Sequence, residues 1–308
     1  MIKFVCPSMT ERGYMPQLQA QYWEGVSDEF YLTNCFPEVN GEPSWALSWA
    51  FPLRKTHNAV FETGFFADAG HIDRLGLYER SSLNTTEGVS KIKEFSAPER
   101  AADLMQRNNY GSKYRQVGIP VKWDGPVLGA QIGYDLSIRS VGEKELYWEF
   151  IEAACKYYGK HLFIKLHPRG PVENRLKHEE IANRYKVKHG VCDLSVLNTC
   201  SFLLVYCSTL AMDAFIRGTP VAQYAPGYWH KTGAVTYTDW SLPDDVEDTV
   251  EMGHKLADWC AWKYCFNYSM PREMWFNLLR LYADSEDLFP ITDEFCYATN
   301  YHWRQTDA

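Results

Sequence analysis

The sequence has no closely paired cysteines, no long apolar run and no excess of positive charge, and each absence removes a class of protein. Nine cysteines lie scattered among 308 residues without metal-site spacing, which indicates reduced thiols and no zinc site. No apolar run approaches the roughly 18 residues that span a bilayer, and the first residues predict a strand rather than a signal peptide. We therefore expect a cytoplasmic protein. The net charge of -8 argues against a chain that binds mainly by neutralising nucleic-acid phosphates.

The composition is that of an ordinary globular chain of two-domain size. Hydrophobic residues make up 46% and charged residues 23%, which excludes a disordered chain and allows two cores of about 150 residues each. Aromatic residues reach 15%, a content that suits stacking on sugar rings or bases and equally suits large cores. Composition therefore limits the fold without choosing a function.

The first half of the chain contains short apolar segments and one helix. Four segments are expected to be strands: 1–7, 30–33, 59–62 and 126–131. A helix is expected at 97–108, where Pro98 stands in the first turn. We place a boundary at 140–143. This gives an N-terminal domain 1–140, a second domain 141–268, and a C-terminal helix and tail 269–308 that we expect to pack back on the first.

The second half alternates strand and helix. Strands are expected at 162–166, 185–188, 201–207 and 218–224. Helices are expected at 143–158, 172–185, 194–199, 210–217, 245–268 and 271–282. The first of these helices carries an apolar side made of Leu146, Phe150, Ile151 and Ala154. Such alternation is typical of a parallel sheet covered by helices on both faces.

Two strands of this second half end on residues suited to holding phosphate. One runs into Lys165-Leu166-His167-Pro168-Arg169, where cationic side chains surround a proline that stops the strand. The other ends at Ser208-Thr209, just before the helix expected at 210–217, where hydroxyls and backbone N–H groups would meet an anion. Taken singly, the first run predicts only a turn and the second only a helix cap. Together, at the carboxyl ends of parallel strands, they predict a nucleotide site.

Four segments carry a resemblance to a known family. They are Phe61-Glu62-Thr63-Gly64-Phe65, then Asp73-Arg74-Leu75-Gly76-Leu77-Tyr78 with Ser82-Leu83-Asn84, then Gln131-Ile132-Gly133-Tyr134-Asp135-Leu136-Ser137, and Lys165-Leu166-His167-Pro168. These resemble motifs of the bacterial capsular polysaccharide β-Kdo transferases, and more loosely of polysialyltransferases and sialyltransferases. The resemblance implies an α/β fold of the GT-B type, with two Rossmann-like domains whose parallel sheets face each other across a cleft. It also implies that domain 1–140 serves the acceptor and domain 141–268 binds the nucleotide-sugar donor.

The resemblance assigns two catalytic carboxylates. Glycosyl transfer needs a stabilised leaving group and a carboxylate near the anomeric carbon. By resemblance, Asp135 is the nucleophile of a retaining double displacement and Glu62 the general acid/base. The competing interpretation makes Glu62 a surface charge at a strand end and Asp135 a helix N-cap.

The remaining predicted site residues divide between donor and acceptor. Expected donor-binding residues are Lys165, His167, Arg169, Ser208, Thr209 and Asp213, the last standing where the family has a Glu that suits a ribose. Expected substrate contacts are Gln131, Ser137, His71 and Asp73, the last two being plain loop residues in the alternative interpretation. No Asp-x-Asp motif occurs, so we expect no metal site and no cofactor beyond a CMP- or UDP-linked sugar as co-substrate.

One departure from the family affects the donor sugar. Phe66-Ala67-Asp68 stands where the family has Arg-Ser, so a cation that could meet the carboxylate of an acidic sugar is missing. The leading interpretation is a metal-independent glycosyltransferase that uses a nucleotide sugar and modifies a polysaccharide or glycolipid. The alternatives are a phage-type transferase acting on hydroxymethylated pyrimidines in DNA, an inactive GT-B module that binds sugar, and a nucleotide-sugar epimerase.

A single dense basic stretch bears on the DNA alternative. It consists of Arg175, Lys177, His178, Arg184, Lys186, Lys188 and His189. Such a stretch would suit DNA phosphates, but it equally fits the solvated face of a helix.

Overall fold

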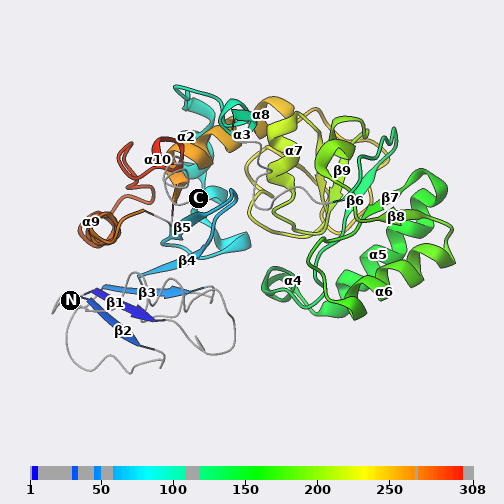
Figure 1. The fold of residues 1–308 in the computed structure, drawn as a ribbon, viewed down its shortest axis with the longest axis horizontal. Helices are drawn as coiled ribbons and strands as arrows, with labels where there is room; N and C mark the ends of the chain where they lie inside the picture. The colour runs from blue at the N-terminus through cyan, green and yellow to red at the C-terminus, as the bar shows by residue number, and fades with distance from the viewer. Residues whose placement is uncertain are drawn as a thin grey trace. The chain divides into compact units, whose positions relative to one another are not determined.

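The computed structural model describes residues 2–5, 30–33, 45–49, 58–107, 118–267 and 270–300 of the chain. The chain divides into two units (Figure 1). Unit 1 comprises Met1–Leu77 with Cys260–Ala308, and unit 2 comprises Tyr78–Trp259. Within the described residues each unit contains one six-stranded sheet. These limits differ from the predicted domains. The first domain was predicted to end at residue 140, but unit 2 begins at Tyr78, and the strand Val127–Gly129 belongs to its sheet.

The sheet of unit 1 is mixed, with the strand order β12-β5-β4-β3-β1-β2. Its strands are β1 (Ile2–Val5), β2 (Phe30–Thr33), β3 (Trp45–Trp49), β4 (Ala59–Thr63), β5 (Ala69–Asp73) and β12 (Cys265–Asn267). The first four pair in parallel, whereas β5 runs antiparallel to β4 and to β12. The prediction of a wholly parallel sheet is therefore wrong for this unit. The connection from β4 to β5 is too short for a parallel crossover and closes with a 2.6 Å hydrogen bond from Gly64 N to Ala69 O.

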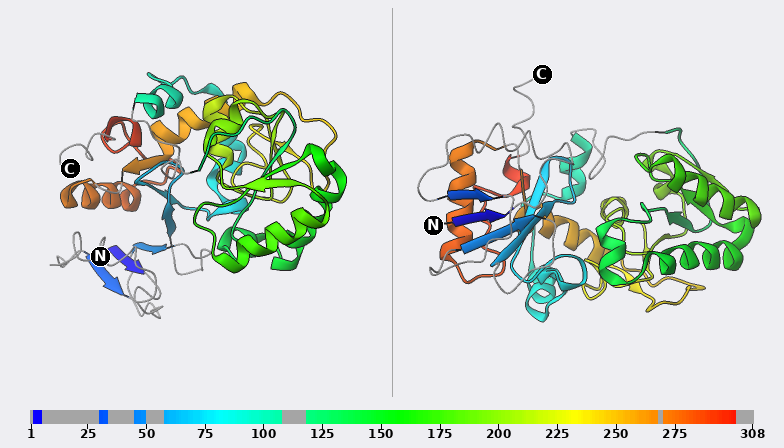
Figure 2. Two further views of the ribbon diagram at one scale, coloured as in Figure 1. Left: turned by 45° about the vertical axis from the view of Figure 1, so that its right-hand side comes forward. Right: turned by 90° about the horizontal axis from the view of Figure 1, so that it is seen from below.

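The C-terminal segment of unit 1 packs on this sheet through aromatic rings. Trp275, on α9 (Arg272–Asp284), meets Phe61 of β4 and Phe266 of β12 edge to face, with ring centroids 5.7 and 5.0 Å apart. Figure 2 shows α9 (orange) beside the strands of the first sheet (blue). The expected helix 245–268 is helical only from Val250 to Tyr264. Helix α8 (Val250–Trp259) passes into a π-helical turn (Cys260–Tyr264), and strand β12 follows because Phe266 is buried in the sheet.

The sheet of unit 2 is parallel throughout, in the order β11-β10-β9-β6-β7-β8. The strands are β6 (Val127–Gly129), β7 (Phe163–Lys165), β8 (Lys188–Gly190), β9 (Leu203–Val205), β10 (Val221–Gln223) and β11 (Thr236–Tyr237). The chain builds β6, β7 and β8 toward one edge and then β9, β10 and β11 toward the other. This is the doubly wound order of a dinucleotide-binding sheet, and its direction switches between β6 and β9.

Helices cover both faces of this sheet, as the alternation predicted. The helical segments of unit 2 are the 3-10 turns Tyr78–Arg80, Ser82–Asn84, Gly159–His161 and Leu194–Asn198, and the α-helices α2 (Thr86–Glu94), α3 (Ala101–Arg107), α4 (Leu136–Val141), α5 (Lys144–Tyr158), α6 (Val172–Arg184), α7 (Ala211–Arg217) and α8. Figure 1 shows α7 on one side of β6 and β9, with α5 and α6 on the other. The strand expected at 185–188 begins later, because Lys186 adopts a left-handed turn with φ 57° after α6.

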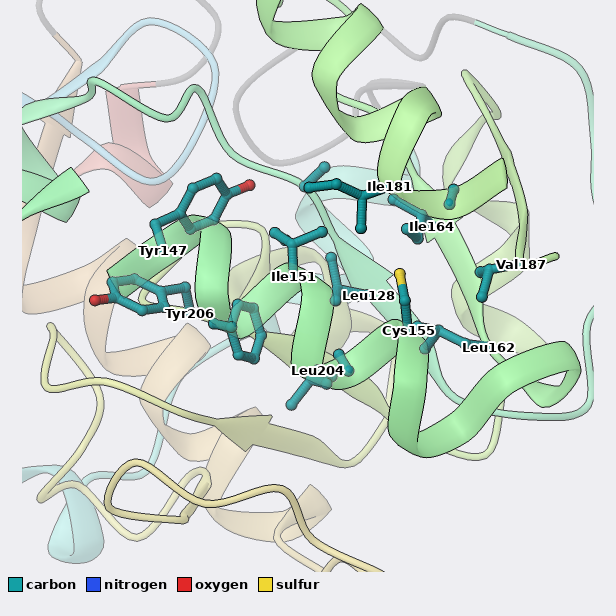
Figure 3. Close-up of a cluster of buried hydrophobic side chains, with 14 of the residues drawn as sticks. Leu128, Tyr147, Ile151, Cys155, Leu162, Ile164, Ile181, Val187, Leu204 and Tyr206 are labelled. Carbon is teal, nitrogen blue, oxygen red and sulfur yellow. The ribbon is translucent and has the colours of Figure 1, made fainter. Parts of the chain in front are cut away.

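The core of unit 2 lies between the sheet and helices α5 and α6 (Figure 3). Leu128, Ile164 and Leu204, one from each central strand, are buried against Ile151 of α5 and Ile181 of α6. The periodic stripe of α5 is as predicted, except that Leu146 is 39% exposed and Tyr147 takes the buried position.

Unit 1 also contains a short C-terminal helix, α10 (Tyr297–Asn300). Within the described part of the chain, no helix combines the length and apolarity needed to cross a membrane.

Candidate active site

Three predicted site segments meet at one edge of the sheet of unit 2. Strands β9, β6 and β7 are neighbours and parallel, so their carboxyl ends lie side by side. Gln131 follows β6, His167 follows β7 and Ser208 follows β9. The structure thus assembles the segments at the switch point, the place where doubly wound sheets bind their ligands.

Gln131 joins the strand ends on the two sides of the switch point. Its Oε1 accepts a hydrogen bond from the backbone N of Cys207 at 3.1 Å, and its Nε2 lies 3.3 Å from Oγ of Ser137. The residue is 5% exposed. Gln131 was predicted to contact substrate, and the structure gives its amide a role inside the protein, where it holds the end of β9 against the start of α4.

A buried chain of polar groups fixes the backbone around Gln131. The hydroxyl of Tyr147 lies 2.8 Å from the backbone N of Gln131 and 2.8 Å from Nε2 of His178. Nδ1 of His178 lies 2.8 Å from the carbonyl oxygen of Asn174. Because a carbonyl only accepts, Nδ1 carries the proton and Nε2 accepts from Tyr147, whose oxygen accepts from Gln131. Burial lowers the pKa of His178 to about 4, which keeps the ring neutral in this tautomer.

The amide of Asn174 completes this chain. Oriented to satisfy both neighbours, its Nδ2 donates to Gln131 O at 3.2 Å and its Oδ1 accepts from Gly133 N at 2.8 Å. Sequence reasoning missed Tyr147 and Asn174, and it assigned His178 to a basic surface. The only available signal was the position of Tyr147 on the buried stripe of α5.

Asp135 stands at the N-terminus of α4. Its Oδ1 accepts a hydrogen bond from the backbone N of Ser137 at 3.3 Å, so it is the N-cap that the alternative interpretation expected. The carboxylate is nevertheless exposed. Capping uses one oxygen and leaves the group accessible, so the N-cap role and the predicted catalytic role are compatible.

His167 is positioned with a defined ring nitrogen. Its Nδ1 accepts a hydrogen bond from the backbone N of Arg169 at 3.1 Å. The proton of the neutral ring therefore resides on Nε2, which is a donor. The imidazole is half-buried in the loop after β7, and the Arg169 side chain is exposed.

Lys165 and Asp213 lie inside the protein. Lys165 is 6% exposed, and its Nζ donates to the carbonyl oxygen of Cys192 at 2.8 Å, which ties the end of β7 to the segment after β8. Burial lowers the pKa of the Lys165 ammonium, while the nearby carboxylate of Asp213 on α7 raises it. The ammonium of Lys165 is therefore bound inside unit 2 by a protein carbonyl.

Ser208 and Thr209 form the turn between β9 and α7. Oγ of Ser208 accepts from the backbone N of Leu210 at 3.1 Å, and Ser208 O accepts from Nε1 of Trp229 at 3.4 Å. Both hydroxyl residues are partly exposed. Helix α7 begins at Ala211, but its N-cap is Leu210 and no side chain caps it, so the interpretation of the hydroxyl pair as a helix cap is wrong.

The predicted residues of unit 1 occupy β4 and β5. Glu62 is half-buried and lies directly opposite His71 in the antiparallel pair. His71 is fully buried and stacks on both Phe65 and Tyr264, each with its ring centroid 5.0 Å away, and those two rings also stack on each other at 5.9 Å.

Asp73 is also fully buried and accepts from the Tyr264 hydroxyl at 2.6 Å and from Leu75 N at 2.8 Å. Neither His71 nor Asp73 reaches the surface of this structure. They belong to a strand that sequence reasoning did not predict, and they support the sheet rather than presenting a side chain to an acceptor.

The basic stretch is partly paired and partly buried. Arg184 contacts Glu152 and Glu180 at 2.8 and 3.1 Å, and Lys177 lies 4.2 Å from the ring centroid of Trp148. His178, as shown above, is buried and neutral. The cations on α6 thus behave as the solvated helix face of the alternative interpretation.

No metal site emerges from the described residues. No three His, Cys, Asp or Glu side chains among them are grouped as ligands for an ion. The described cysteines are free thiols.

The fold has counterparts among solved structures, although sequence comparison finds no relative. No protein-family model matches the chain, and no curated protein matches its sequence. The structure resembles Thermosulfurimonas dismutans KpsC, beta Kdo 2,7 transferase, with a TM-score of 0.56 and 14% identity over 91% of this chain and 99% of that chain. It also resembles the beta Kdo 2,4 transferase of the same organism's KpsC, with a TM-score of 0.50 and 15% identity over 86% of this chain and 92% of that chain. The predicted fold class, α/β of the GT-B type, is confirmed.

Proposed function

We propose that this protein is a glycosyltransferase that moves a sugar from a nucleotide-sugar donor to a hydroxyl acceptor without a bound metal. One observation carries the proposal: the doubly wound sheet of unit 2 brings the His167 loop, the Ser208-Thr209 turn and the Asp135 loop to its switch point. The likeness of the fold to two proteins named as beta Kdo transferases supports it.

The donor phosphate would bind between the ends of β7 and β9. His167 offers an Nε2–H donor, fixed by the Arg169 N–H on its other nitrogen. The turn at Ser208 and Thr209 offers hydroxyls and backbone N–H groups, and the exposed Arg169 adds a positive charge. Such donors stabilise the negative charge that develops on the leaving phosphate. Because Nζ of Lys165 is bonded inside the protein, we assign the direct contacts to His167, Ser208 and Thr209.

The transfer would proceed through two carboxylates, as the family resemblance implies. Asp135 would attack the anomeric carbon and form a glycosyl-enzyme bond while the nucleotide leaves. Glu62 would then take the proton of the acceptor hydroxyl as that oxygen displaces Asp135, so the product keeps the anomeric configuration of the donor. The exposed carboxylate of Asp135 and the half-buried carboxylate of Glu62 are consistent with these roles.

We propose a polysaccharide or glycolipid as the acceptor. Arg175 and Arg184 are paired with glutamates and His178 is buried and neutral, which reduces the positive charge available for DNA binding. A salt titration separates the two acceptors: DNA binding should weaken steeply as salt rises, whereas glycan binding should barely change.

A donor screen tests the proposal directly. The protein would be incubated with CMP-, UDP-, GDP- and TDP-linked sugars, and its melting temperature measured, since a ligand that binds only the native state raises it. The donor that binds should then be consumed in the presence of a glycan acceptor, with the sugar recovered on that acceptor. Failure of all four donor classes to bind would contradict the proposal.

A further inference from the structure

The segment after β10 contains an ordered polar cluster outside the predicted site. Asn84 reaches it from the 3-10 turn Ser82–Asn84 of the same unit. Its Nδ2 donates to Gly227 O at 2.9 Å, and its Oδ1 accepts from Lys231 N at 3.1 Å. One buried amide thus fixes both ends of the segment 227–231.

His230 lies within this fixed segment with one nitrogen committed. Its Nδ1 lies 2.8 Å from Gly227 O, and because a carbonyl only accepts, Nδ1 must carry a proton. The ring meets Tyr237 edge to face at 5.5 Å, which holds its plane. Among the residues that the structure describes, none hydrogen-bonds to Nε2.

The ring of His230 is held neutral. Burial is the largest effect and lowers its pKa; the Gly227 bond raises the pKa by less than burial lowers it, and the smaller effects of Lys231 and Glu79 oppose each other. A neutral ring with a proton on Nδ1 has a lone pair on Nε2. This half-buried side chain therefore presents one hydrogen-bond acceptor of fixed direction.

The neighbouring residue connects this acceptor to the proposed phosphate site. Nε1 of Trp229 donates to Ser208 O at 3.4 Å, so His230 is one residue away from a contact with the Ser208-Thr209 turn. In a nucleotide sugar, the groups on either side of the phosphates are the ribose and the transferred sugar. Both present hydroxyl groups, which are hydrogen-bond donors.

We propose that Nε2 of His230 accepts a hydrogen bond from a hydroxyl of the nucleotide sugar next to its phosphates, on the ribose or on the transferred sugar. Asn84 serves as a positioning residue, because it fixes the carbonyl of Gly227 that sets the ring. The inference rests on the proposed donor site and adds a specificity-determining residue to it.

Two substitutions distinguish the loss of the hydrogen-bond acceptor at Nε2 from damage to the fold. In His230→Asn, the amide can still donate to Gly227 O in place of Nδ1, but nothing remains at the position of Nε2. In His230→Gln, the longer amide places an oxygen near the position of Nε2. We expect His230→Asn to weaken the Kd about tenfold, the effect of one hydrogen bond, and His230→Gln to restore most of the affinity. His161→Asn makes the same chemical change at an exposed histidine and should bind as the wild type does.

The choice of probe identifies the hydroxyl. Calorimetry would use CMP and UDP, their 2′,3′-dideoxy analogues, and the intact donors UDP-glucose and CMP-N-acetylneuraminic acid. If His230 binds the ribose, His230→Asn should lower the affinity for CMP or UDP and leave the affinity for the dideoxy analogues unchanged. If His230 binds the transferred sugar, the substitution should lower only the affinity for the intact donors.

The outcomes distinguish this inference from the proposed function. If the wild type binds a probe and folded His230→Asn binds every probe equally well, the His230 inference is wrong and the donor site stands. If the wild type binds no CMP-, UDP-, GDP- or TDP-linked sugar, both are wrong. Should His230→Asn fail to fold, nitrogen NMR of the wild-type imidazole gives the answer. The Nε2 resonance, assigned with His230→Gln, must move when the probe binds, and a stationary resonance overturns the inference.

Discussion

Oε1 of Gln131 accepts a hydrogen bond from the backbone N of Cys207 at 3.1 Å, and this bond links the two strands between which the sheet of unit 2 changes direction. In a doubly wound sheet the loops on either side of that point diverge and leave a crevice. Here one side-chain amide spans the two loop starts. The Asp135 loop and the Ser208-Thr209 turn are thereby held at a fixed separation, although they come from different parts of the chain.

Replacing Gln131 by Leu should destabilise unit 2 by about 1 to 3 kcal/mol. Leu fills a similar volume but leaves the buried N–H of Cys207 without its acceptor, and an unsatisfied buried group costs about that much. The free energy of unfolding would be measured by urea denaturation. Ser137→Ala, which removes only the 3.3 Å contact at Nε2 of Gln131, is the control and should lose less. Equal stability of Gln131→Leu and wild type would contradict the linking role.

The buried His178 predicts an acid-sensitive fold. The unfolded chain binds a proton at this imidazole with an ordinary pKa of 6.5, whereas the native state binds it only near pH 4. Between these values the unfolded state holds more protons, so stability is complete above pH 6.5 and falls as the pH drops toward 4. The difference corresponds to about 3 kcal/mol.

Urea denaturation at several pH values measures this slope. In His178→Gln the titrating group is gone, so its slope between pH 6.5 and 4 should be flatter than that of the wild type. His161→Gln makes the same substitution at an exposed histidine and serves as the comparison variant. Identical slopes in the wild type and His178→Gln would show that His178 does not control the acid response.

Donor binding should depend on the two strand ends that flank β6. His167→Ala and Ser208→Ala should each weaken nucleotide binding by about 1 to 3 kcal/mol, the range for losing a hydrogen bond to a charged group. Isothermal calorimetry with the donor found in the screen gives the values, and His161→Ala provides a surface control. Unchanged affinity in both site variants would remove the donor site from this edge of the sheet.

The sequence predicted much of the sheet of unit 2 because the signals of its strands are local. Strands β6, β7, β9 and β10 are short apolar runs that end at glycine, proline or hydroxyl residues, and their alternation with helices implies parallel pairing. These local signals were enough to predict that His167 and Ser208 lie at the same edge of the sheet.

The residues that sequence reasoning missed depend on distant partners. Strand β5 contains Gly70 and the polar His71 and Asp73, and it is buried because it lies between β4 and β12, with Tyr264 and Phe65 packed on His71. His178 lies in a charged local sequence and is buried because Tyr147 supplies the partner for Nε2. Local patterns carry no information about such pairings, which form only when the chain folds.

The catalytic assignment makes a sharp prediction because Asp135 also caps α4. Asn is as good an N-cap as Asp, so Asp135→Asn should keep α4 in place and still bind donor. It should lose turnover by several orders of magnitude, since the amide retains the shape but cannot attack the anomeric carbon. The free energy of unfolding and the donor affinity are measured together with kcat. If both are unchanged, the loss of turnover does not come from unfolding. Near-normal turnover would exclude the double displacement.

Glu62 completes the test from the other unit. Glu62→Gln should also be nearly inactive, but for a different reason: Asp135 can still attack the donor, while no base remains to activate the acceptor hydroxyl. The glycosyl-enzyme should therefore accumulate and add the mass of one sugar to the intact protein. Asp135→Asn cannot form this adduct and is the matched control. If Glu62→Gln is inactive without an adduct, and the wild-type product has the inverted anomeric configuration, the reaction is a single displacement with Glu62 as its base.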